Sequence, residues 1–65
     1  MLIKVSGDKI EVPGSFSVEQ LIQLKNAPDN VVVVLNGDIV DAKAWESTRL
    51  NMNDEVELIR FVAGG

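Results

Sequence analysis

The chain has 65 residues, of which 46% are hydrophobic and 25% charged, and its formal net charge is −4. This length allows one domain with a small core, and the acidic balance argues against nucleic acid and anionic membranes as partners, because clustered Lys and Arg bind both. There is no cysteine, histidine or tyrosine, so disulfides and thiolate metal sites are excluded and no imidazole can activate a nucleophile. We therefore expect no catalytic residue, no metal and no bound cofactor. The reducing cytoplasm suits such a chain, in which no signal peptide or spanning run is visible.

The first quarter of the chain predicts a β-hairpin. Residues 2–6 and 9–12 alternate apolar and polar side chains, which is typical of half-buried strands. Gly7-Asp8 separates them and predicts a two-residue turn, with the glycine supplying a positive φ at the first central position. Pro13-Gly14 ends the second strand, because proline donates no ladder hydrogen bond.

The next segment predicts a helix over 18–25. Ser17 and Gln20 have the spacing of a capping box, in which each side chain bonds the other residue's backbone N–H. Phe16 is placed to pack on Leu21 as a hydrophobic staple. Apolar residues recur at helical spacing, so one face of the helix is expected to cover a sheet.

Residues 31–35 form an unbroken apolar run, which predicts a strand that is covered on both faces or lies in the middle of a sheet. Asn36-Gly37 predicts a tight type I′ hairpin turn into a short strand at 39–40. The short segment 41–46 is compatible with a single helical turn. Trp45 is interpreted as a plug at the edge of the core rather than as a contact surface.

The closing segment predicts a strand that begins after a polar turn at 51–54. Val56 and Leu58 alternate with acidic residues, so one face meets the core and the other water. Gly64-Gly65 lack side chains to pack, so the strand is expected to present a bare carboxylate on a slender thread. A frayed or vector-derived end is the alternative explanation of the two glycines.

The order of these elements is ββαβββ, which places the protein in the α+β class. We expect the first and last strands to pair at the middle of a mixed sheet of about five strands wrapped on one helix. Residues 1–62 are expected to form a single domain and residues 63–65 a flexible C-terminal tail.

This order resembles the ubiquitin-like β-grasp fold and, more narrowly, the small sulfur-carrier proteins of bacterial thiamin biosynthesis. The resemblance covers the whole chain in length and order. It rests on Leu35-Asn36-Gly37-Asp38-Ile39-Val40, Trp45, Thr48-Arg49-Leu50, and the segment from Asp54 to Gly65. The chain departs from the family pattern at Asp41-Ala42, where many relatives have a proline and a basic residue, and at Asn53-Asp54, where Gly-Asp is frequent.

The resemblance implies a mechanism for the C-terminus. An adenylating enzyme would use ATP to activate the Gly65 carboxylate, a sulfur donor protein would help convert the adenylate to a thiocarboxylate, and thiazole synthase would take the sulfur. Gly64 and Ala63 would form the stem that threads narrow active sites.

The parity of the last strand also predicts a docking surface. If Val56 and Leu58 face the core, Ile59 and Phe61 fall on the opposite face. Together with Val62 they would offer exposed apolar side chains beside the reactive end, as protein interfaces require. Ordinary packing under a neighbouring loop is the alternative.

Three other functions are compatible with the sequence. A molybdopterin-type sulfur carrier or a protein modifier would use the same activated carboxylate, although molybdopterin carriers are usually longer. A non-covalent ubiquitin-like binding module would not need the two terminal glycines at all.

Overall fold

The computed structural model describes residues 1–60, which form one sheet, one α-helix and a short 3₁₀ turn. The elements in chain order are β1 (Leu2–Val5), β2 (Asp8–Glu11), α1 (Val18–Leu24), β3 (Val32–Leu35), β4 (Asp38–Val40), η1 (Ala42–Ala44) and β5 (Glu55–Ile59).

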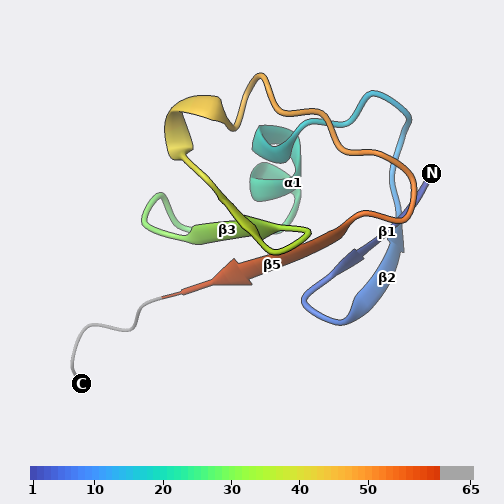
Figure 1. Cartoon of the computed structure of the whole chain (residues 1–65), viewed down its shortest axis with the longest axis horizontal. Helices are drawn as coiled ribbons and strands as arrows, with labels where there is room; N and C mark the ends of the chain where they lie inside the picture. Colours follow the sequence, from blue (N-terminus) through green and yellow to red (C-terminus); the bar gives the residue numbers. More distant parts are fainter. Residues whose placement is uncertain (61–65) are drawn as a thin grey trace.

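The sheet has the strand order β2-β1-β5-β3-β4, so the last strand of the chain lies at its centre. β5 runs parallel to β1 and antiparallel to β3, while β1–β2 and β3–β4 are antiparallel hairpins. Figure 1 shows α1, η1 and the segment leading to β5 on the same side of this sheet. The predicted α+β class, the mixed five-stranded β-grasp sheet and the pairing of the first strand with the last are confirmed.

α1 begins where the sequence predicts. Ser17 N donates to Gln20 Oε1 at 2.9 Å and Gln20 N donates to Ser17 Oγ at 3.1 Å, which completes the predicted capping box. Lys25 is the C-cap residue, one position beyond the helix. Val18, Leu21 and Ile22 are buried on the helix face that packs on the sheet, so α1 supplies one wall of the core.

The first hairpin turn lies one residue earlier than predicted. Its central residues are Ser6 and Gly7, with φ of 47° and 89°, and not Gly7-Asp8. Both angles are positive, as a type I′ turn requires, and the glycine occupies the second central position. Asn36 and Gly37, with φ of 49° and 90°, form the same kind of turn, as predicted.

Trp45 is buried at the edge of the core, with 8% of its surface exposed, as predicted. Its Nε1 donates to the Val40 carbonyl at 3.1 Å, which satisfies the polar end of the ring. η1 precedes it directly, with Asp41 as its N-cap, and confirms the predicted helical turn in this segment.

Neither helical segment in residues 1–60 has the length and apolar character needed to cross a membrane. The predicted boundary between a domain ending at residue 62 and a tail over 63–65 lies outside the described residues.

Candidate functional site

The reactive end predicted from the sequence lies beyond the described part of the chain. This holds for Gly65, for its stem of Gly64 and Ala63, and for Phe61 and Val62. The site that the structure does show is therefore the platform from which this end leaves the fold, namely β5 and the surfaces around it.

β5 is paired on both sides at its beginning and with β3 as far as its last residue. Its register with β3 runs over four residue pairs, from Val56 opposite Leu35 to Ile59 opposite Val32. Val56 is 1% exposed, and Leu58 is partly buried against the same core, as the alternation predicts. A strand held this firmly is a stiff base for the residues that follow it.

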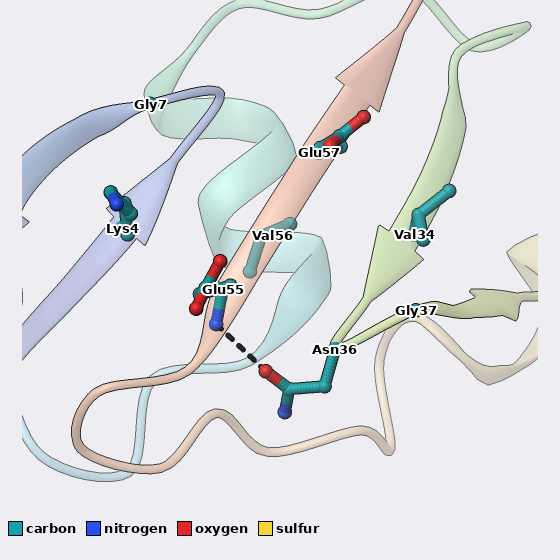
Figure 2. A pocket seen from close by; sticks show the side chains of 8 residues that line it. All are labelled: Lys4, Gly7, Val34, Asn36, Gly37, Glu55, Val56 and Glu57. Carbon is teal, nitrogen blue, oxygen red and sulfur yellow. Dashed lines mark hydrogen bonds between the residues drawn. The ribbon is translucent and has the colours of Figure 1, made fainter.

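A polar clamp, which we define as Asn36 and Asp54, fixes the start of β5. Asn36 Nδ2 donates to Asp54 Oδ1 at 3.0 Å, and Asn36 Oδ1 accepts from Glu55 N at 2.9 Å, a bond drawn in Figure 2. The other carboxylate oxygen of Asp54, which is 9% exposed, accepts from Asn51 N at 2.7 Å. The turn after β3 is thereby fastened to the turn before β5.

Sequence reasoning missed this clamp, although it identified both turns. The Asn36-Gly37 pattern accounts only for the backbone of Asn36, and the polar composition of 51–54 indicates only a turn at Asp54. The available signal was an aspartate directly before a strand, because a carboxylate at such a position accepts bonds from nearby backbone N–H groups.

We expect Asn36→Ala to lower the free energy of unfolding by about 1–2 kcal/mol more than Asn53→Ala. Both residues have a positive φ, 49° and 69°, so both variants place alanine in the left-handed region. Only Asn36 also donates and accepts through its side chain in the described structure. Urea denaturation of the two variants measures the difference, and equal losses would show that the clamp contributes nothing beyond the turn.

The face of the sheet turned away from α1 carries an apolar patch. Partners in a ladder point to the same face, so the register places Ile59 beside Val32, and Val34 beside Ile39. Ile59 and Ile39 are 39% and 75% exposed, and the two valines are partly exposed. We call these four residues the open-face patch. It lies over the half of β5 that leads to the C-terminus.

The predicted exposure of Ile59 is therefore observed. Of the two explanations of the apolar run 31–35, the second applies, because β3 lies inside the sheet between β5 and β4 and only one of its faces is covered. Val33 is fully buried on the helix side, whereas Val32 and Val34 face the open side. The run lacks alternation because its second face belongs to the patch. An unbroken apolar run such as 31–35 is thus also compatible with a strand that has one buried face and one exposed apolar face.

Charged side chains lie next to the open-face patch, on the same face of the sheet. Figure 2 views it with α1 behind the sheet, and shows Lys4 near Glu55, with Glu57 further along β5. Lys4 and Glu55 are partners in the β1–β5 register. Among residues 1–60, the ion pair found joins the Met1 amino group to Glu11, at 2.7 Å. The carboxylates of β5 are thus available to a partner protein.

No group of acidic side chains in the described residues is arranged to hold a metal ion. The geometry therefore offers a strand that presents a chain end, an exposed apolar patch beside it and carboxylates along it. Such a platform suits recognition by another protein.

Comparison with known proteins identifies the family of this chain. The model of the ThiS family matches residues 2–65. The crystal structure of a thiamine biosynthesis protein, ThiS, from Geobacter metallireducens is similar with a TM-score of 0.84 and 29% identity, over 100% of both chains. An NMR solution structure of a thiamine biosynthesis protein from the same organism gives 0.82 and 28%, over 100% of this chain and 88% of that one. No curated protein matches the sequence. Because the family model spans almost the whole chain, the protein belongs to the ThiS family.

Proposed function

We propose that this protein is a sulfur carrier of thiamin biosynthesis, which delivers sulfur for the thiazole ring as a thiocarboxylate on Gly65. The observation that carries the proposal is the family match over residues 2–65, which includes the terminal Gly-Gly. The similar solved structures, which are described as thiamine biosynthesis proteins, support the same pathway.

The proposed chemistry activates the Gly65 carboxylate in two steps. On an adenylating enzyme, the carboxylate attacks the α-phosphorus of ATP, and pyrophosphate leaves. A sulfur nucleophile at the oxidation level of sulfide then attacks the acyl carbon, so that a C–S bond forms, the C–O bond to AMP breaks and AMP departs. Activation is needed because a free carboxylate is a poor acceptor for a nucleophile.

In this scheme the chain is the substrate of its partners and not a catalyst. The sequence has no histidine and no cysteine, so the adenylating enzyme supplies the acid–base groups and the nucleotide site. Gly64 and Ala63 form a thin stem that fits a narrow active site. A sulfur donor protein supplies the sulfur to Gly65, and thiazole synthase takes it from there. Both steps take place in the cytoplasm, where ATP is present.

We further propose that the open-face patch docks on the adenylating enzyme. Ile59 lies one residue before the last described one, so a partner that covers it also reaches the start of the C-terminal segment. Phe61 and Val62 would extend this contact along the chain. Exposed apolar residues surrounded by charged ones are the usual centre of such an interface.

We expect Ile59→Ala to weaken binding to the adenylating enzyme about tenfold while lowering the free energy of unfolding by about 1 kcal/mol or less. The matched control is Leu24→Ala, which removes an exposed apolar side chain, 58% exposed, from α1. Isothermal titration calorimetry and thermal denaturation separate the two effects. Equal weakening in both variants, or none in Ile59→Ala, would contradict docking through the patch.

Intact-mass measurement tests the proposed function directly. The purified chain is incubated with the adenylating enzyme of the thiamin pathway, ATP and sodium sulfide. We expect a mass gain equal to the exchange of one oxygen for one sulfur, dependent on ATP. An unchanged mass with an active enzyme would overturn the proposal, and a gain equal to attachment to another protein would indicate a protein modifier instead.

A further inference from the structure

The two neighbours of β5 do not cover it to the same point. On the β3 side, pairing continues to Ile59, the last residue of the strand. On the β1 side, the register stops at Val5 opposite Val56, because β1 turns away at Ser6 into the first hairpin. The end of β5 therefore has one paired edge and one open edge.

The hydrogen bonds show where this open edge begins. Ser6 N donates to the Val56 carbonyl at 2.8 Å, which is the last backbone bond from β1 to β5. Leu58 N donates to the side-chain Oγ of Ser6 at 3.3 Å, so a hydroxyl replaces the missing strand at this point. Backbone groups of residues 56 and 58 point to the same edge of β5, and an extended continuation of the strand brings those of Arg60 to that edge as well. Within residues 1–60, no backbone donor reaches the Leu58 carbonyl.

A hollow lies directly beside this edge. We call it the notch, and its lining residues are Val5, Ser6, Asp8, Lys25, Leu58 and Arg60. It lies between the first hairpin, the C-terminal end of α1 and the end of β5.

The notch carries more positive than negative side chains, in contrast to the chain as a whole. Lys25 and Arg60 bring two positive charges to it, against the single carboxylate of Asp8, although the whole chain carries a net charge of −4. None of these three side chains forms an ion pair within the described residues. An acidic group of a partner is therefore the complementary ligand, and a guanidinium can bind a carboxylate through two hydrogen bonds.

We propose that the notch receives an extended, acidic segment of the adenylating enzyme, which adds to β5 as a strand and places a carboxylate between Lys25 and Arg60. An unpaired row of backbone groups is satisfied best by another extended backbone, and flanking side chains then select the sequence of the added strand. The identity of the partner rests on the proposed function, whereas the notch itself rests on the β5 edge and its two cations.

This strand addition would also position the reactive end. Gly65 is the fifth residue after Arg60, so the terminal carboxylate lies at most about 17 Å from Arg60 along an extended chain. A partner strand that holds Leu58 and Arg60 removes much of the conformational freedom with which the end would otherwise search for the active site. The notch is thus a positioning device and not a catalytic one.

Charge-reversal variants test the side-chain part of the proposal. We expect Lys25→Glu/Arg60→Glu to weaken binding to the adenylating enzyme at least about tenfold in calorimetry, with a smaller dependence of the affinity on salt. Lys43→Glu is the control, since it reverses an exposed cation on η1, which does not line the notch. Wild-type affinity in the double variant, or equal weakening in the control, would overturn the proposal.

A second pair of variants measures the contribution of the Arg60 backbone N–H to binding. Arg60→Ala removes only the side chain, whereas Arg60→Pro also removes the N–H that points to the open edge. We expect proline to bind about fivefold more weakly than alanine, which corresponds to one hydrogen bond. In the wild-type complex, amide hydrogen exchange at Arg60 is expected to slow. Equal affinities together with unchanged exchange would exclude strand addition, and thermal denaturation checks that both variants are folded.

The outcomes separate this proposal from the proposed function. Normal sulfur exchange by variants with unchanged affinity would refute the notch and leave the carrier function intact. A wild-type chain that neither binds the adenylating enzyme nor gains sulfur would refute both the function and the proposed occupant. A concentration-dependent dimer in sedimentation, abolished by Arg60→Pro, would assign the notch to a second copy of the chain and overturn the proposal.

Discussion

Deletion of Gly65 is expected to abolish sulfur loading while leaving the free energy of unfolding unchanged. The shortened chain still ends in a glycine carboxylate, so its intrinsic reactivity is the same. Its carboxylate lies about 3.5 Å closer to the fold, however, and displacements of this size remove the reacting atom from a productive geometry. Intact-mass analysis after incubation with the adenylating enzyme, ATP and sodium sulfide measures the loss.

Two further variants distinguish the effect of the length of the C-terminal segment from the effect of its carboxylate. A chain that ends in a Gly65 amide keeps the full length but has no carboxylate to adenylate, so it is also expected to gain no sulfur. Gly65→Ala keeps both the length and the carboxylate and adds one methyl group, so its loading rate reports the width of the partner's channel. Full loading of the Gly65 deletion would contradict a length-dependent mechanism and favour an enzyme that accepts any C-terminal carboxylate.

Local sequence signals predicted most of the fold correctly. The capping box at Ser17 and Gln20 gave the start of α1, because its two hydrogen bonds join residues only three apart. Asn36-Gly37 gave the second hairpin, because both positions need a positive φ. At the first hairpin the same turn is formed by Ser6-Gly7, and a serine with positive φ is not a signal that residue preferences provide.

The contacts between distant segments that the sequence did not reveal depend on strand order. The clamp joins Asn36 to Asp54, 18 residues away, and exists because β3 lies beside β5. The notch exists because β1 ends before β5 does, which only the register shows. Exposure of Ile59 followed from parity within one strand, but the contribution of Ile39 to the same patch required knowledge that β4 pairs with β3.

Leu21→Ala is expected to lower the free energy of unfolding by about 3 kcal/mol, the typical cost of a cavity at a fully buried leucine. Leu21 is 0% exposed and lies on the face of α1 that meets the sheet. A domain of this size is stable by only about 3–10 kcal/mol, so the variant should melt roughly 12–24 °C lower than the wild type. Thermal denaturation followed by circular dichroism measures the shift.

Leu24→Ala is the matched control, since it makes the same substitution on the same helix at a residue that is 58% exposed. We expect it to change the stability by no more than about 0.5 kcal/mol. Equal shifts in the two variants would mean that α1 does not bury Leu21 as described.

The same variant distinguishes a damaged scaffold from a damaged site. Well below its melting temperature, Leu21→Ala retains the folded platform of β5, so it should gain sulfur at close to the wild-type rate. On warming, its loading should fail together with its circular dichroism signal, because loading then follows the folded fraction. The Gly65 deletion should fail at every temperature. Loss of loading in Leu21→Ala while it is still folded would show that packing in the core affects the C-terminal end. In that case the end of β5 would not be the independent platform that its position at the centre of the sheet implies.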